Sequence, residues 1–138
     1  MIWKKVDDGF YLVFEPGDKV IESFTKFCKD HHLRTGIFSG IGAFSKITLG
    51  HYNITTKRYM EKDVSDSLEV LSVNGNVTIK EKEPFVHMHA IVSDANMNFY
   101  GGHVIEAEVS VTLELHVTDF RETLHREFDE ELGLFTIK

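Results

Sequence analysis

Alternating hydrophobic and polar residues predict β-strands over most of this chain. The clearest alternation is at 108–117, where Val109, Val111, Leu113, Leu115 and Val117 form one face and polar residues form the other. Shorter β-prone runs predict further strands at 9–14, 47–52, 68–73, 77–79, 85–92 and 97–100. Polar turns are expected at 53–57 and 94–96, and the apolar end of the tail 120–138 predicts a short edge strand.

Only one segment has helical spacing. Its apolar residues recur at intervals of three and four, and they are Val20, Ile21, Phe24, Phe27 and Cys28. This spacing predicts a helix from an N-cap at Asp18 to about Asp30. Cys28 lies on the apolar face, where we interpret it as a core thiol, because no basic residue is placed by sequence to activate it.

One helix among many strands predicts an α+β fold: a mainly antiparallel β-sheet with one long helix packed on one face. The chain has no repeats or linkers, so a single domain is expected over 1–138. The second face of the sheet must also be covered, and self-association is a common way for a small domain to cover it.

Two glycine-containing stretches suggest turns or bends. Asn74-Gly75-Asn76 lies between β-branched runs and predicts a hairpin turn. Gly40 and Gly42 are interpreted as a bulge or a close-packed bend between strands. Phosphate binding there is the weaker alternative, because the dinucleotide fingerprint needs a third glycine where Ser45 stands and a helix where a strand is predicted.

Charge and composition restrict the class of partner. The 138 residues include 15 Lys and Arg against 22 Asp and Glu, a net charge of −7, which repels polyanions and disfavours generic nucleic-acid binding. Cys28 is the only cysteine, so no intramolecular disulfide can form and a reducing compartment is expected. No apolar run is long enough to span a membrane, and residues 1–8 lack the apolar core of a signal peptide, so we expect a cytoplasmic protein without a membrane partner.

Three histidines form the strongest candidate for chemistry. On a strand, His87 and His89 lie on the same face, about 7 Å apart along the backbone. His103 follows Gly101-Gly102, which allows the returning strand to approach closely and bring a third imidazole to the same point. Three histidines with an open fourth position match a catalytic-type zinc (Zn²⁺) centre, and another divalent transition metal would also suit imidazole ligands.

Further residues of the site are less defined by sequence. Carboxylates are expected to orient the ligand histidines or to line the pocket, and the candidates are Asp94, Glu69, Glu106 and Glu114. The chain has no nucleophile elbow, His-Glu-x-x-His helix or P-loop, so its catalytic residues stay unknown. A metal ion at this site could support a reaction on a small molecule, and the sequence does not decide whether it does.

Several segments, taken in order, resemble the PPC (plants and prokaryotes conserved) domain over nearly the whole chain. They are Ser39-Gly40-Ile41-Gly42-Ala43, Leu49-Gly50-His51-Tyr52, 68–76, Pro84-Phe85-Val86-His87-Met88-His89, Gly101-Gly102-His103-Val104 and Val111-Thr112-Leu113-Glu114. The resemblance implies a compact homotrimeric α/β domain in which His87, His89 and His103 are metal ligands. The fold and the histidine pattern are also similar to those of acetolactate decarboxylase, a zinc enzyme whose other catalytic residues cannot be mapped onto this shorter chain.

The resemblance also supplies an alternative function. In plants the domain follows AT-hooks, which are Arg-Gly-Arg-Pro segments that enter the DNA minor groove, and relatives therefore carry a DNA-binding label. This chain has no Arg-Gly-Arg-Pro segment and no basic arm. We therefore expect a metal-binding homotrimer with a three-histidine site whose small-molecule activity is not established, and a DNA-associated or protein-assembly module is the alternative.

Overall fold

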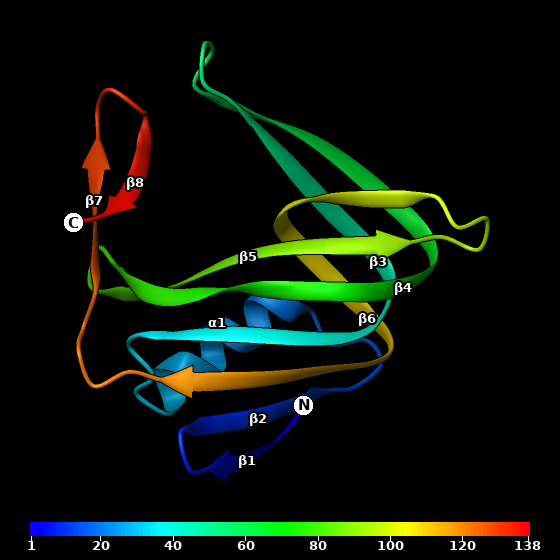
Figure 1. The fold of residues 1–138 in the computed structure, drawn as a ribbon, viewed down its shortest axis with the longest axis horizontal. Helices are drawn as coiled ribbons and strands as arrows, with labels where there is room; N and C mark the ends of the chain where they lie inside the picture. Colours follow the sequence, from blue (N-terminus) through cyan, green and yellow to red (C-terminus); the bar gives the residue numbers. More distant parts are fainter.

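The computed structural model describes residues 1–138, in which eight strands and one helix follow one another along the chain (Figure 1). The elements are β1 (Ile2–Val6), β2 (Gly9–Phe14), α1 (Val20–Asp30), β3 (Gly36–Asn53), β4 (Arg58–Lys80), β5 (Glu83–Ser93), β6 (Phe99–Asp119), β7 (His125–Asp129) and β8 (Leu134–Ile137). None of the helical structure has the length and apolar character that crossing a membrane requires. The mainly antiparallel α+β architecture predicted from the sequence is confirmed.

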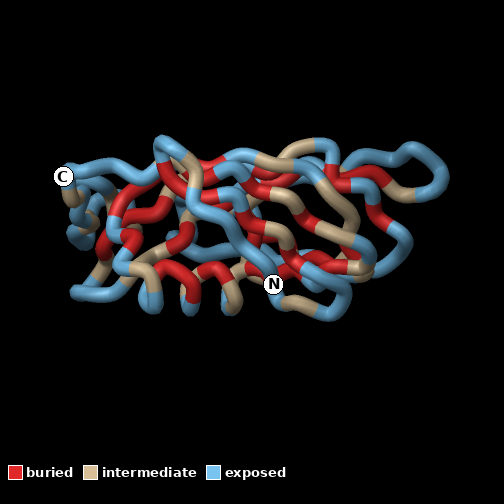
Figure 2. Tube along the Cα trace, turned by 90° about the horizontal axis from the view of Figure 1, so that it is seen from below, coloured by how far each residue is buried: buried red, intermediate tan, exposed pale blue.

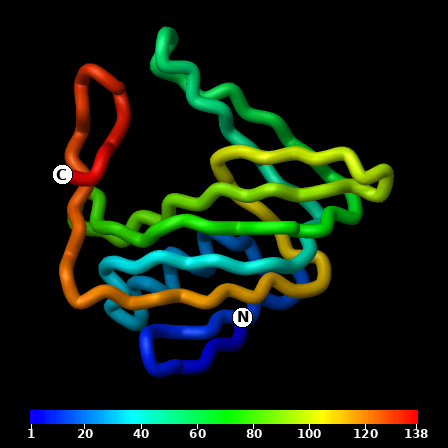
Figure 3. The backbone as a smooth tube through the Cα atoms, viewed as in Figure 1, coloured from blue at the N-terminus to red at the C-terminus, as the bar shows by residue number.

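All strands belong to one sheet, in the order β1-β2-β6-β3-β4-β7-β8, with β5 paired to both β4 and β6. Every pairing is antiparallel except that of β4 with β7. Because β3 pairs with both β4 and β6, the four strands β3, β4, β5 and β6 form a closed cycle of pairings. Figure 3 shows the long strands bending as they follow this cycle. The bend brings β5 and the first part of β6 together.

The core lies between the sheet and α1, in one cluster of 26 buried residues. Burial alternates with exposure along the strands (Figure 2), as a sheet with one covered face requires. The helix contributes Val20, Phe24, Phe27 and Cys28 to the core, as its spacing predicts. At 11 residues, however, α1 is short rather than long.

The start of α1 differs from the prediction. Lys19 is the N-cap and its side chain caps nothing, because lysine carries no acceptor. The predicted cap, Asp18, instead accepts a hydrogen bond from the Glu15 N–H at 2.9 Å. The free N–H groups of Ile21 and Glu22 are taken by the carboxylate of Glu106, at 2.7 and 3.2 Å. A side chain from β6 therefore caps the helix N-terminus in place of a local N-cap residue.

The predicted hairpin turn at Asn74-Gly75-Asn76 is wrong. These residues lie inside β4, where Gly75 pairs with Phe38 on one side and Met88 on the other. A Cβ at Gly75 would overlap the carbonyl oxygen of His87 and lie 2.7 Å from the Phe38 ring. Glycine is needed here for close backbone approach, not for a turn. The real turn is Glu81-Lys82, where φ is 50° and 72°, as a tight hairpin requires.

Several predicted strands are parts of longer ones. The predicted strand 47–52 belongs to β3, which begins earlier, at Gly36, and the predicted strands 97–100 and 108–117 belong largely to β6. The predicted bulge is confirmed as a register shift between Gly40 and Gly42. A second shift, in the pairing of β3 with β6 between Gly42 and Phe44, leaves Val111 67% exposed. Simple alternation placed Val111 on the buried face, and it cannot anticipate such a shift.

The loops match the prediction more closely. Residues 54–57 form a turn in which the Asn53 side chain accepts hydrogen bonds from the N–H groups of Thr55 and Thr56. The Asp94 carboxylate holds the turn between β5 and β6 through the N–H groups of Asn96 and Asn98. The tail forms the β7–β8 hairpin rather than one edge strand, with β8 at the edge of the sheet.

Candidate metal centre

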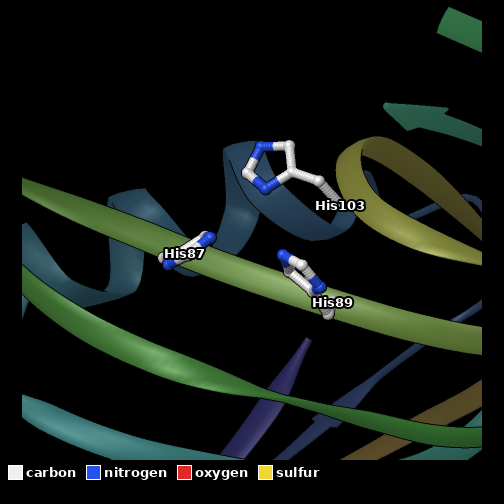
Figure 4. A group of neighbouring side chains, drawn as sticks. All are labelled: His87, His89 and His103. Atoms are coloured by element: carbon white, nitrogen blue, oxygen red, sulfur yellow. The ribbon is translucent and has the colours of Figure 1, made fainter. Parts of the chain in front are cut away.

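The three predicted histidines converge on one point of the sheet (Figure 4). His87 and His89 project from the same side of β5, where their backbone partners on β4 are Asn76 and Asn74. His103 on β6 pairs directly with His89. One nitrogen from each imidazole lies within 4.8 Å of the other two. The strand period and the β5–β6 pairing together account for this arrangement.

The Gly101-Gly102 pair permits the close approach that the sequence predicted. A Cβ at Gly102 would lie 3.0 Å from the Gly50 carbonyl oxygen, and one at Gly101 would lie 3.2 Å from that of Ala90. Both distances are tighter than ordinary van der Waals contact. Side chains at these positions would push β6 away from its neighbours and carry His103 with it.

The geometry of the three imidazoles fits a tetrahedral metal. Their ring centroids lie 5.2, 5.2 and 5.6 Å apart. Nitrogen ligands at about 2.0–2.1 Å from zinc lie roughly 3.4 Å from one another, so small side-chain rotations suffice to close the three on one ion. His103 Nδ1 is buried and has no hydrogen-bond partner. A buried nitrogen without a partner is costly unless it binds something, and a metal ion is a suitable ligand for it.

Burial favours the neutral form of two of these imidazoles, those of His87 and His103. The pKa of His87 is lowered to about 4, first by burial and then by the nearby charges of Arg126, His103 and His89. The pKa of His103 is lowered by burial first, then by His89 and Arg126. A neutral imidazole has a free lone pair on one ring nitrogen, which is the form that binds metal. The two histidines are therefore in their metal-binding form at neutral pH.

Arg126 is the residue of this site that the sequence did not indicate. It lies on β7, and its guanidinium donates to Thr78 Oγ1 at 2.8 Å, to the Phe135 carbonyl at 2.9 Å and to Asn76 Oδ1 at 3.0 Å. A fourth contact joins Arg126 Nη2 and His87 Nδ1 at 3.3 Å. No local motif marks this arginine, because only the parallel pairing of β7 with the end of β4 brings it to the histidines.

A cleft of about 490 Å³ opens beside the histidines, between β5 and the C-terminal hairpin. It is lined by Tyr59, Lys80, Phe85, His87, His103, Arg126, Phe128, Gly133, Leu134, Phe135 and Thr136. The hairpin is held over it by hydrogen bonds to the tip of β3–β4, from Tyr52 Oη to the Leu132 carbonyl and from Lys57 Nζ to the Glu130 carbonyl, both 2.7 Å. The only charged side chains in the lining are cationic, those of Lys80 and Arg126.

The predicted carboxylates are not brought to the histidines. Glu69 and Glu114 line a different cleft of about 450 Å³, together with Ile41, Leu71 and Val111. Asp94 holds the β5–β6 turn, and Glu106 caps α1. Within the chain, the polar neighbour of His87 is therefore the Arg126 guanidinium rather than a carboxylate.

Comparison with known families gives one match. The family model of the Plants and Prokaryotes Conserved (PCC) domain, the family also abbreviated PPC, matches residues 3–121. The three histidines lie inside the matched range, whereas Arg126 and the β7–β8 hairpin lie beyond it. None of the curated proteins matches the chain in sequence.

Solved structures with the same fold include three prokaryotic proteins. A candidate DNA-binding protein from Bacteroides thetaiotaomicron has a TM-score of 0.96 and 25% identity, over 99% of this chain and 96% of that one. The metal-containing protein AF0104 from Archaeoglobus fulgidus has a TM-score of 0.88 and 30% identity, over 100% and 99%. A plant- and prokaryote-conserved (PPC) protein from Pyrococcus horikoshii has a TM-score of 0.84 and 28% identity, over 91% and 89%.

A more distant likeness extends to alpha-acetolactate decarboxylase from Bacillus subtilis. Its TM-score is 0.58 at 12% identity, over 91% of this chain and 58% of the enzyme. At this identity the similarity concerns the fold alone. The expected likeness in fold is thus present.

Proposed function

The chain belongs to the Plants and Prokaryotes Conserved (PCC) domain family, and we propose that it is a metal-binding member in which His87, His89 and His103 hold one zinc ion. The observation that carries the proposal is the convergence of one nitrogen from each imidazole within 4.8 Å. The unpartnered His103 Nδ1 supports it. So does the similarity to AF0104, which is described as metal-containing.

The residues around the three histidines define the chemistry that a bound zinc ion would supply. Three imidazole ligands leave one coordination position of a tetrahedral zinc for water or a ligand oxygen, so the ion would act as a Lewis acid there. The cleft beside His87 and His103 gives a small molecule access to that position. The Tyr59 ring lies 5.1 Å from that of His103 and lines the same cleft. We therefore propose a site for a small-molecule ligand.

Metal content tests the proposal directly. Protein purified without a His-tag is expected to contain about one zinc per chain by elemental mass spectrometry, and His87→Ala or His89→Ala is expected to lose it. His51→Ala is the matched control, because His51 is an exposed histidine outside the cluster. Substoichiometric metal in the wild type, or equal loss in His51→Ala, would refute the proposal.

Assembly into a homotrimer is part of the proposed function. The family resemblance implies it, and exposed apolar side chains in the 450 Å³ cleft support it: Ile41 is 62%, Leu71 49% and Val111 67% exposed. Large apolar side chains clustered on a surface are typical of association sites. Light scattering at micromolar concentration is expected to give three times the chain mass, and a monomeric mass would contradict assembly.

DNA association is the second candidate function, favoured by the description of the Bacteroides thetaiotaomicron protein. The net charge of −7 and the missing Arg-Gly-Arg-Pro segment oppose it in this chain. In a gel-shift titration at physiological salt we expect no binding tighter than the roughly 10⁻⁶ to 10⁻⁴ M of non-specific contacts. A nanomolar complex would favour the DNA function over the metal-dependent one.

A further inference from the structure

Two cations in the cleft beside the histidines have no carboxylate partner. Arg126 donates its hydrogen bonds to neutral acceptors only, on Thr78, Asn76 and Phe135. The Lys80 side chain forms no ion pair and no hydrogen bond. The chain has 22 acidic residues against 15 basic ones, so carboxylates are not scarce. Unpaired, partly buried cations are costly, which indicates that a further group balances this charge.

The acidic residues nearest to Arg126 in sequence are directed elsewhere. On β7, Arg126 and Phe128 line the cleft, and strand alternation places Glu127 and Asp129 on the opposite side. Asp129 is also engaged, accepting from the Leu132 N–H at 3.1 Å and from Lys138 Nζ at 3.0 Å. The hairpin thus presents its cation to the cleft and its acids to the outside. An anion from solution is the remaining partner.

The rest of the cleft lining is suited to the non-polar part of a small organic ligand. Aromatic rings form much of the wall, and the cations are stacked on them: Lys80 Nζ lies 4.2 Å from the Phe135 ring centroid and the Arg126 guanidinium 5.1 Å from that of Phe85. These contacts hold both charges at the wall without neutralising them. A volume of about 490 Å³ is large enough for a small organic molecule.

The contact between Arg126 and His87 links this charge to the metal site. A neutral imidazole has a single lone-pair nitrogen, so His87 cannot both accept from Arg126 at Nδ1 and ligate a metal through Nε2. Ligation through Nδ1 uses the same lone pair. Either way, when His87 is a ligand Arg126 Nη2 keeps Asn76 Oδ1 as an acceptor but loses His87, so one of its N–H groups is free. One N–H of Nη1 also has no acceptor, because the other donates to the Phe135 carbonyl. One donor then remains on each terminal nitrogen, as pairing with a carboxylate requires.

From these contacts we propose that the cleft binds a small organic carboxylate with an apolar body, held by Arg126 and Lys80 next to the metal. The inference rests on the proposed metal site, since the ion is the third positive group facing the ligand. The cleft is less suited to binding a phosphate ester, because no helix begins there to supply backbone N–H groups to the phosphate oxygens. The body of the ligand would lie against Phe85, Phe128 and Phe135.

Benzoate is a suitable probe, with benzamide as its neutral isostere and inorganic phosphate as a second anion. Binding to zinc-loaded, untagged protein is measured by calorimetry, together with zinc content and circular dichroism for every variant. We expect benzoate to bind and benzamide and phosphate to bind far more weakly. Lys80→Gln should weaken benzoate binding roughly fivefold or more, and Arg126→Gln roughly tenfold or more, as loss of charged hydrogen bonds does.

Controls separate recognition from folding. Arg121→Gln and Lys4→Gln remove exposed cations outside the cleft and should leave benzoate binding unchanged. Arg126→Gln also removes bonds that hold β7, so Lys80→Gln, which removes none, is the decisive variant.

Each result discriminates between the two proposals. Three results would overturn the carboxylate site and leave the metal proposal intact. They are no binding of benzoate to zinc-loaded wild type, equal affinity for benzoate and benzamide, and equal loss of benzoate affinity in Lys80→Gln and Lys4→Gln. Benzoate affinity unchanged in zinc-free protein would overturn the shared site. Wild type that takes up no zinc would instead refute the proposed function itself.

Discussion

At the scale of single residues, Gly75 controls the backbone geometry around His87. It is flanked in the sheet by Phe38 and Met88, and any Cβ would overlap the His87 carbonyl oxygen. The residue that suggested a turn therefore sets the spacing between β4 and the strand that carries two of the histidines. A methyl group there would have to displace backbone, not a flexible side chain.

Gly75→Ala is accordingly expected to lower the free energy of unfolding by about 3 kcal/mol or more and to reduce zinc content. Urea denaturation and elemental analysis measure the two effects. Asn74→Ala is the control, because the Asn74 side chain is exposed on the adjacent position of β4, and it should change stability by less than about 1 kcal/mol. Equal effects of the two substitutions would contradict the close-packing explanation.

Cys28 illustrates a residue whose environment makes it inert. It is fully buried on α1, and burial raises the pKa of its thiol to about 12. Only the thiolate reacts with disulfide reagents, so at pH 8 both access and ionisation are lacking.

In native protein at pH 8, Cys28 is therefore expected not to react with an aromatic disulfide reagent over an hour, and to react within minutes in denaturant. Absorbance of the released thiol follows the reaction. Because the folded pKa is far above 8, raising the pH to 9 should not restore native-state reactivity. Fast labelling of native protein would show that the α1 face opens readily.

At the scale of elements, α1 depends on a strand distant in the sequence. The Glu106 carboxylate on β6 accepts from the N–H groups of Ile21 and Glu22, which are the second and third residues of the helix. This bidentate cap substitutes for the local cap that Lys19 cannot supply. It joins the helix to the sheet through a polar contact in addition to the core.

Glu106→Ala should therefore destabilise the protein by about 1–2 kcal/mol, the cost of leaving helix N–H groups without a cap. The shift in denaturation midpoint measures this loss. Glu108→Ala, two residues along β6, removes an exposed carboxylate that contacts only Ser45 at 3.3 Å and should cost much less. Zinc content should stay unchanged in both variants, because neither residue contacts the histidines.

At the scale of the whole molecule, two clefts differ in the character of the side chains that line them, and we propose a different role for each. The cleft lined by Ile41, Leu71 and Val111 carries exposed apolar groups, whereas the one beside the histidines carries unpaired cations. We assign the first to contact between chains and the second to a ligand.

Val111→Glu tests the first assignment. It places a charge on a side chain that is already 67% exposed, so the single chain should fold with a native circular dichroism spectrum. The assembled form should be lost, because an interface core would have to bury that charge. Light scattering distinguishes the two states. Thr56→Glu, in the exposed turn after β3, is the control, and a trimeric Val111→Glu variant would contradict the assignment.

The sequence by itself determined the amphipathic helix, most of the strand positions and the three histidines. These features depend on local periodicity: a period of two sets His87 and His89 on one side, and spacings of three and four bury Phe24 and Cys28. The family resemblance rests on the same local strings and is confirmed by the match over 3–121.

Only the tertiary structure decided which strands are continuous, where Gly75 lies and what surrounds the histidines. Pairing between strands distant in sequence brings Arg126 and Lys80 to the triad and takes Glu106 to the start of α1. Such contacts depend on register and on shifts within long strands. At Val111 the shift exposes one side chain while Val109 and Leu113 on either side of it stay buried, which local alternation cannot predict. The three candidate ligand histidines could therefore be predicted from the sequence, whereas the charge of the cleft beside them could not.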